Sequence, residues 1–93
     1  MSRRWQIDSL VTSRRLGDEL LAYHAGSGDT HLLTPFSEAL LDALPAAGTG
    51  PSAGLEEVRA HPRVAAFAAS EREVADALWQ LQEAGIVCAV TDA

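Results

Sequence analysis

The sequence contains no lysine, a single cysteine and no long apolar run. Because Cys88 stands alone, one chain can form neither an intramolecular disulfide nor a cysteine-based zinc site. No segment approaches the roughly 18 apolar residues that a membrane-spanning helix needs. Residues 1–5 lack the apolar stretch of a signal peptide. We therefore expect a cytoplasmic protein that has no cofactor and no metal and does not associate with membranes.

The charge is predominantly acidic. Thirteen Asp and Glu residues outnumber seven arginines, which gives a net charge of −6. Affinity for a nucleic-acid backbone depends on clustered positive charge, so this balance argues against nucleic acid as a partner. The 93 residues are 47% hydrophobic, which is typical of one small domain, spanning residues 1–93, with a modest core.

The first third of the chain favours β-structure. Residues 5–11, 19–25 and 30–33 are apolar runs of strand length. Residues 14–18 between the first two runs end in Gly-Asp, and residues 26–29 between the second and third contain two glycines, which suit a hairpin. These signals predict a three-stranded antiparallel meander whose third strand lies at an edge.

Helical signals follow the meander. Thr34 can cap a helix and Pro35 fits its first position, so residues 35–44 are predicted to be helical. Residues 45–53 form a connector rich in Gly and Pro. A short second helix is expected to start near Leu55 and to end near His61, and residues 63–69 read as a helical turn or as an extension of that helix.

A third helix carries the clearest boundaries. Ser70 and Glu73 match a capping box, and Gly85 is suited to end a helix, so residues 71–84 are predicted to be helical. The apolar residues 86–90 read as a last short strand. The predicted fold class is α+β and winged-helix-like, with a three-stranded antiparallel sheet followed by three helices. That architecture is used by DNA-binding and peptide-binding proteins alike.

Several features together resemble a known family. They are Trp5, Arg14, Tyr23, the stretch "SGDTHLL" at residues 27–33 and the stretch "LWQLQEAGIV" at residues 78–87. The chain resembles the PqqD-like peptide chaperones, in particular the branch associated with the HPr-rel-A system, which are relatives of the RiPP recognition element. The resemblance implies a non-enzymatic domain of natural product biosynthesis that captures a ribosomally made precursor (leader) peptide and presents it to a modifying enzyme.

The resemblance also implies where the peptide binds. It adds as a strand beside the third strand, in a groove that the third helix completes. The candidate peptide-binding residues are Thr30, His31, Leu32 and Leu33 on the strand and Ala75, Trp79 and Gln82 on the helix. The strand is uncharged apart from its histidine, as expected of an edge kept open for a partner. Alternation places Thr30 and Leu32 on one face and the other two strand residues on the opposite face, and it leaves open which face is buried.

Three further interpretations concern the polar residues near the hairpin and, separately, the single cysteine. Ser27, Asp29 and His31 are spaced like an imagined triad, but residues two apart on a hairpin do not converge, so we expect Ser27 and Asp29 to bond turn amides. His24 and His31 are expected to lie across the hairpin from each other, as a cross-strand pair rather than a metal site. Cys88 reads as a small apolar residue.

Two alternative functions remain beside peptide binding. The first is a winged-helix DNA-binding regulator, which the third helix disfavours because it carries one arginine against four acids. The second is a structural subunit that forms a homodimer through the same open edge. The acidic helix also predicts that a bound peptide carries Lys or Arg.

Overall fold

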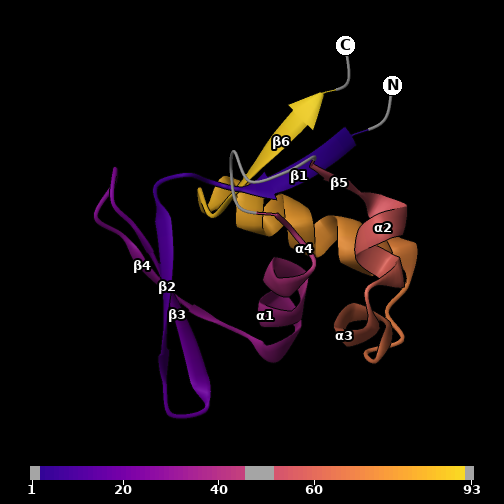
Figure 1. The fold of residues 1–93 in the computed structure, drawn as a ribbon, viewed down its shortest axis with the longest axis horizontal. Coiled ribbons are helices and arrows are strands. Elements are labelled where there is room, and N and C mark those ends of the chain that lie inside the picture. Colours follow the sequence, from indigo (N-terminus) through magenta and orange to yellow (C-terminus); the bar gives the residue numbers. More distant parts are fainter. Residues whose placement is uncertain (1–2, 46–51, 92–93) are drawn as a thin grey trace.

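The computed structural model describes residues 3–45 and 52–91, which fold into two antiparallel sheets and four helices (Figure 1). The elements in chain order are β1 (Arg3–Ile7), β2 (Val11–Leu16), β3 (Glu19–His24), β4 (Thr30–Leu33), α1 (Pro35–Asp42), β5 (Ala53–Gly54), α2 (Leu55–Ala60), α3 (Pro62–Ala65), α4 (Glu71–Glu83) and β6 (Val87–Thr91). The α+β class is therefore confirmed. The predicted connector at residues 45–53 lies largely outside the described part of the chain.

Each sheet has three strands. Sheet A has the order β5-β1-β6 and brings the two ends of the chain together, with Trp5 opposite Ala89 on one side and opposite Ala53 on the other. Sheet B is the meander β2-β3-β4 and stands to one side of the helices (Figure 1). Its two turns contain Gly17 and Gly28, which have φ angles of +63° and +78°, a region that glycine enters without steric cost.

The predicted meander is correct for its second and third strands and wrong for its first. The run at residues 5–11 is divided, because the Asp8 side chain accepts a hydrogen bond from the Leu10 amide at 2.8 Å and the chain turns there. The segment before this turn is β1 of sheet A. The segment after it continues through Arg14 and Arg15 as β2, so the residues expected to form a turn are mostly strand, and the turn itself is confined to Gly17 and Asp18.

The helix boundaries follow their capping residues. The Thr34 hydroxyl accepts the Ser37 amide at 3.1 Å at the start of α1. At the start of α4, Ser70 and Glu73 form the predicted capping box, with both side-chain bonds at 3.1 Å. The prediction of three helices is wrong, because the described chain has four. A separate turn, α3, begins at Pro62, whose predecessor adopts the extended backbone that a residue before proline prefers.

One hydrophobic core joins both sheets to the helices. Its fully buried side chains include Leu40 of α1, Val58 of α2 and Leu78 of α4. Sheet B contributes Ala22 and Leu33, and sheet A contributes Trp5. Since α1 packs against β4, α3 and α4, it is the element that fixes sheet B relative to the rest of the core.

Candidate functional site

The exposed fractions of its side chains show which face of β4 is buried. Leu33 is only 8% exposed and His31 lies directly opposite the fully buried Ala22, so these two strand residues are on the core face. Thr30 and Leu32 point outward, and Leu32 is 59% exposed. The strand that sequence reasoning selected therefore combines a buried anchor with an exposed leucine.

The outer edge of β4 carries backbone groups that are not used by sheet B. The His24 amide bonds the Asp29 carbonyl at 2.9 Å, which marks a hydrogen-bonded pair at the turn. In an antiparallel ladder such pairs alternate, so His31 and Leu33 exchange their bonds with β3. The N–H and C=O groups of Thr30 and Leu32 consequently face the open side, where the described residues form no further strand.

The α4 residues of the predicted site lie away from the buried stripe of the helix. Val74, Leu78 and Leu81 fill the core, as the sequence pattern predicts. Trp79 is 47% exposed. Its neighbours Ala75 and Gln82 are half-buried.

The structure places the strand residues and the helix residues in two groups. The main neighbours of β4 are β3 and α1, and α4 also packs on α1. Three cavities in the described ranges were compared: one at the end of β4, one between α2, α3 and α4, and one beside Trp5 and Glu57. None of these three is lined by residues of both groups. Within the two groups, His31 Nε2 and Gln82 Oε1 are buried atoms without a hydrogen-bond partner, a costly arrangement in a folded protein.

A cavity of about 370 Å³ lies at the end of β4. Leu32, Leu33, Thr34 and Pro35 form one side, and Asp18, Glu19 and Glu38 supply carboxylates. Both Arg15 and Arg63 pair with Glu38, and the bond from Arg15 in particular holds the pKa of this carboxyl below its usual range. Among the described residues Asp18 and Glu19 take part in no ion pair. The cavity therefore offers an apolar wall and two uncompensated negative charges beside the open edge.

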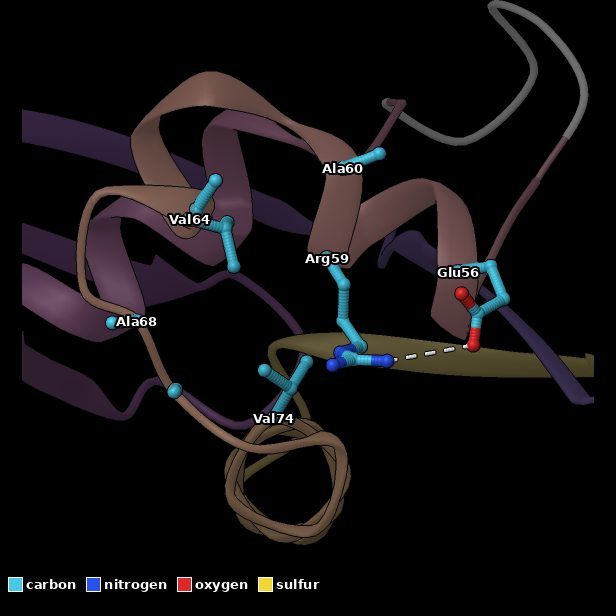
Figure 2. A pocket seen from close by; sticks show the side chains of 8 residues that line it. Glu56, Arg59, Ala60, Val64, Ala68 and Val74 are labelled. Carbon is cyan, nitrogen blue, oxygen red and sulfur yellow. Dashed lines mark ion pairs between the residues drawn. The ribbon is translucent and has the colours of Figure 1, made fainter.

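A second cavity, of about 380 Å³, lies between α2, α3 and the start of α4 (Figure 2). It is lined mainly by alanine and valine, including Val64, Ala68 and Val74. Figure 2 shows the Arg59 side chain entering it and pairing with Glu56 at 3.6 Å. These two charges compensate each other, and the lining contains no nucleophile, so this cavity adds nothing to the predicted site.

The β3–β4 turn is organised by a residue that the sequence reasoning did not assign to it. Ser27 accepts the Asp29 amide at 3.3 Å, as expected, but the Asp29 side chain bonds no turn amide. Instead His24 Nδ1 accepts the Gly26 and Ser27 amides, both at 3.1 Å. The expected His24–His31 cross-strand pair is wrong, because the register places His31 opposite Ala22.

The cysteine is also more than a small apolar residue. Cys88 Sγ donates to Asp8 Oδ2 at 3.1 Å and is partly exposed. The hydrogen bond to this carboxylate, with burial as the second cause, raises the pKa of the Cys88 thiol to about 11. The bonds from the Leu10 amide and from the thiol lower the pKa of Asp8. A thiol held protonated in this way is a poor nucleophile at neutral pH.

Residues 3–45 and 52–91 contain no candidate metal site and no candidate membrane helix. No group of three or more His, Cys, Asp or Glu side chains there is arranged to hold a metal ion. Of the helices in these ranges, none has the length and apolar character to cross a bilayer. In the comparisons with known proteins, no family model, curated protein or solved structure matches this chain.

Proposed function

We propose that this chain is a non-enzymatic peptide-binding domain that captures a precursor peptide by strand addition at β4 and presents it to a modifying enzyme. One observation carries the proposal: the backbone groups of Thr30 and Leu32 face an unpaired sheet edge next to an exposed leucine side chain. In strand addition the main chain supplies affinity, and alternate side chains supply specificity. The PqqD-like resemblance supports the same role and the same strand.

The other edges of the two sheets suit this role less well. β2 carries Arg14 and Arg15, and charged side chains are a common means of blocking an edge. β5 has only two residues. β6 is uncharged, and β4 has no charged residue besides His31, but no β6 residue lines any of the three cavities compared above. β4 adjoins the cavity formed by Leu32 and Pro35, so it offers side-chain as well as main-chain contacts.

The proposed partner is an extended peptide that combines apolar and basic residues. Trp79 supplies an exposed aromatic surface on α4, and aromatic residues are frequent anchors of interfaces. The acids of α4 and the two unpaired carboxylates beside β4, Asp18 and Glu19, favour Lys or Arg in the peptide. Because these charges are exposed, they act on association rate and salt dependence more than on final affinity.

We also propose that sheet B with the helices that follow it is the winged-helix-like part of the domain, and that sheet A is an addition to it. In this arrangement β2 and β3 form the wing and α4 occupies the position of a recognition helix. The acidic surface of α4 disfavours DNA in that position, which leaves peptide binding as the favoured use of the architecture.

The experiment uses two matched proline variants. Leu32→Pro removes an amide that faces the open side of β4, and proline is tolerated at such a position of an edge strand. The Asp8 amide donates to the Ile86 carbonyl, and alternation along the β1–β6 ladder then turns the Ala89 amide to the open side of β6. Ala89→Pro is therefore the matched control. Peptides selected from a displayed library of random sequences serve as the ligand, and amide chemical shifts of the labelled protein report the binding site.

The expected result is that a selected peptide shifts the amides of Thr30 and Leu32 and the indole of Trp79. Leu32→Pro is expected to weaken binding at least tenfold while Ala89→Pro leaves it unchanged, with both variants keeping the wild-type melting temperature within a few degrees. Peptides that instead bind β6, or a library that yields no binder, would contradict the proposal. Sedimentation of the free protein separates the homodimer alternative, because a dimer through β4 would already occupy the edge.

A further inference from the structure

The imidazole of His24 lies where three parts of the molecule meet. It sits at the end of β3, and its Nε2 atom is 3.6 Å from Asp8 Oδ1 at the end of β1. On its other side Nδ1 accepts the amides of Gly26 and Ser27 in the β3–β4 turn. The ring therefore connects the turn before β4 to sheet A.

Gly26 makes room for this ring, and Gly85 lies in contact distance of it. A Cβ atom at Gly26 would lie 2.9 Å from His24 Cε1, closer than real side chains approach. A Cβ atom at Gly85, which follows α4, would lie 3.5 Å from His24 Cδ2. The imidazole thus occupies a slot between the turn and the carboxyl end of α4, and its 16% exposed side chain has little freedom to move within it.

The two turn bonds require a neutral ring. Nδ1 accepts hydrogen bonds only through its lone pair, and a proton on this atom would oppose the amide protons of Gly26 and Ser27. The hydrogen of the neutral ring then resides on Nε2, where it points toward Asp8. In the neutral state the turn is capped, and the contact with Asp8 is a weak one at 3.6 Å.

The other groups facing His24 favour the charged ring. Asp8 is an ionised carboxylate whose pKa is lowered. Cys88 bonds the second oxygen of the same carboxylate and stays a neutral thiol. The end of α4 at Gly85 adds the negative pole of a helix, which attracts imidazolium. The turn amides and the burial of the ring oppose protonation, so the two protonation states favour two different arrangements.

We propose that His24 is a pH-sensitive switch in which protonation replaces the two hydrogen bonds to the β3–β4 turn with an ion pair to Asp8. The proton comes from solvent and binds Nδ1, and no other bond is made or broken covalently. Loss of both turn bonds frees the amides of Gly26 and Ser27 and loosens the connection that positions the first residue of β4.

The switch also has a consequence for ligand binding, which rests on the proposed function. An edge strand binds a peptide through preordered backbone groups, so a loosened turn lowers affinity. A peptide bound at neutral pH would be released more readily when the pH falls. The reverse linkage follows, because a peptide that orders β4 would make His24 harder to protonate.

The test follows the ring and the turn separately by nuclear magnetic resonance between pH 8 and pH 5. At pH 8 the ring nitrogens of His24 are expected to show a proton on Nε2 alone. As the pH falls, the Gly26 and Ser27 amides are expected to change with the same midpoint as the His24 ring, and their protection from hydrogen exchange is expected to drop about tenfold. A His24 ring that titrates while these amides keep their protection would overturn the switch.

Two variants give the test its controls. His24→Asn retains a side-chain acceptor for the turn amides and cannot titrate, so the transition at Gly26 and Ser27 is expected to disappear. His61 Nδ1 also accepts a backbone amide, that of Arg63 at 3.3 Å, and His61→Asn is expected to leave the transition intact. A transition that persists in His24→Asn would assign it to His31 or His61 and overturn the proposal.

Peptide affinity is measured separately with a library-selected peptide at pH 8 and pH 5.5. Wild-type protein is expected to lose at least fivefold more affinity than His24→Asn over this interval. Equal losses in the two proteins would overturn the regulatory part. A protein that binds no peptide at either pH but keeps the transition in the turn would refute the proposed function and leave the switch standing.

Discussion

Asp8→Asn is expected to activate the thiol of Cys88. In the folded protein Asp8 accepts the Sγ hydrogen bond at 3.1 Å, and its negative charge opposes formation of a thiolate. Both effects contribute to a pKa of about 11 in place of the ordinary 9.0. A difference of two pKa units corresponds to about 100-fold less thiolate at any pH below 9.

Because burial is a second cause of the raised pKa, the variant is expected to recover only part of this factor. We expect Asp8→Asn to react at least about tenfold, but less than 100-fold, faster with iodoacetamide between pH 7 and pH 8.5. The measurement is the alkylation rate as a function of pH, with the rate of urea-unfolded protein as the reference for a fully accessible thiol. Asp18→Asn, at the opposite end of sheet B, is the charge-matched control and is expected to leave the rate unchanged.

The pH profile separates this explanation from simple shielding. A thiol that is slow because of its pKa reacts faster with every pH unit up to about 11, whereas a thiol that is slow because it is covered levels off near 9. If wild-type protein levels off near pH 9 and Asp8→Asn follows the same curve, the role assigned to Asp8 is refuted.

The remaining predictions concern stability and partners. Stability is expected to fall as the pH drops below about 4.5, because the pKa values of Glu38 and Asp8 are lower in the folded protein than in the unfolded chain. The stabilisation from these two carboxylates is therefore present above their unfolded-state pKa values and is lost as each of them is protonated. Thermal melting from pH 7 to pH 3 measures this loss, and an unchanged melting temperature would contradict it. Ser70→Ala removes the cap of α4 and is expected to cost about 1 kcal/mol in urea unfolding, with Ser13→Ala as a control because that exposed hydroxyl in β2 caps no helix. Trp79→Ala is expected to weaken peptide binding by about 1–3 kcal/mol with little change in melting, and a large loss of stability would show instead that this side chain mainly supports the fold. No binding to random duplex DNA is expected at physiological salt in fluorescence anisotropy, and micromolar binding that weakens steeply with added salt would contradict the acidic-surface argument.

Features set by neighbouring residues could be predicted from the sequence. The start of α1 at Thr34 and Pro35, the capping box of α4 and the end of that helix at Gly85 all depend on side chains within a few residues of the backbone they bond. The β3–β4 hairpin is a local feature for the same reason. The bounds of β4, residues 30–33, therefore agree with the prediction.

Features set by distant partners could not be predicted. The run at residues 5–11 looks like one strand, and it is divided because its first half pairs with β6 and its second half with β3. Arg15 was expected in a turn because residues 14–18 end in Gly-Asp, but it belongs to β2, where it pairs with Glu38 of α1. The buried face of β4 likewise depended on which side α1 covers.

The pairing of β1 with β6 has a mechanical consequence. Asp8 and Cys88 are 80 positions apart in sequence and in contact in space, and the antiparallel register places Arg3 opposite Thr91 at the end of the ladder. A force that separates these two ends would load the hydrogen bonds one at a time, as in opening a zipper, rather than all together. Sheet A would part at low force while the β2–β3–β4 meander, held by shorter loops and by α1, remained folded. Tension on the chain would therefore open one sheet and leave the edge at β4 in place.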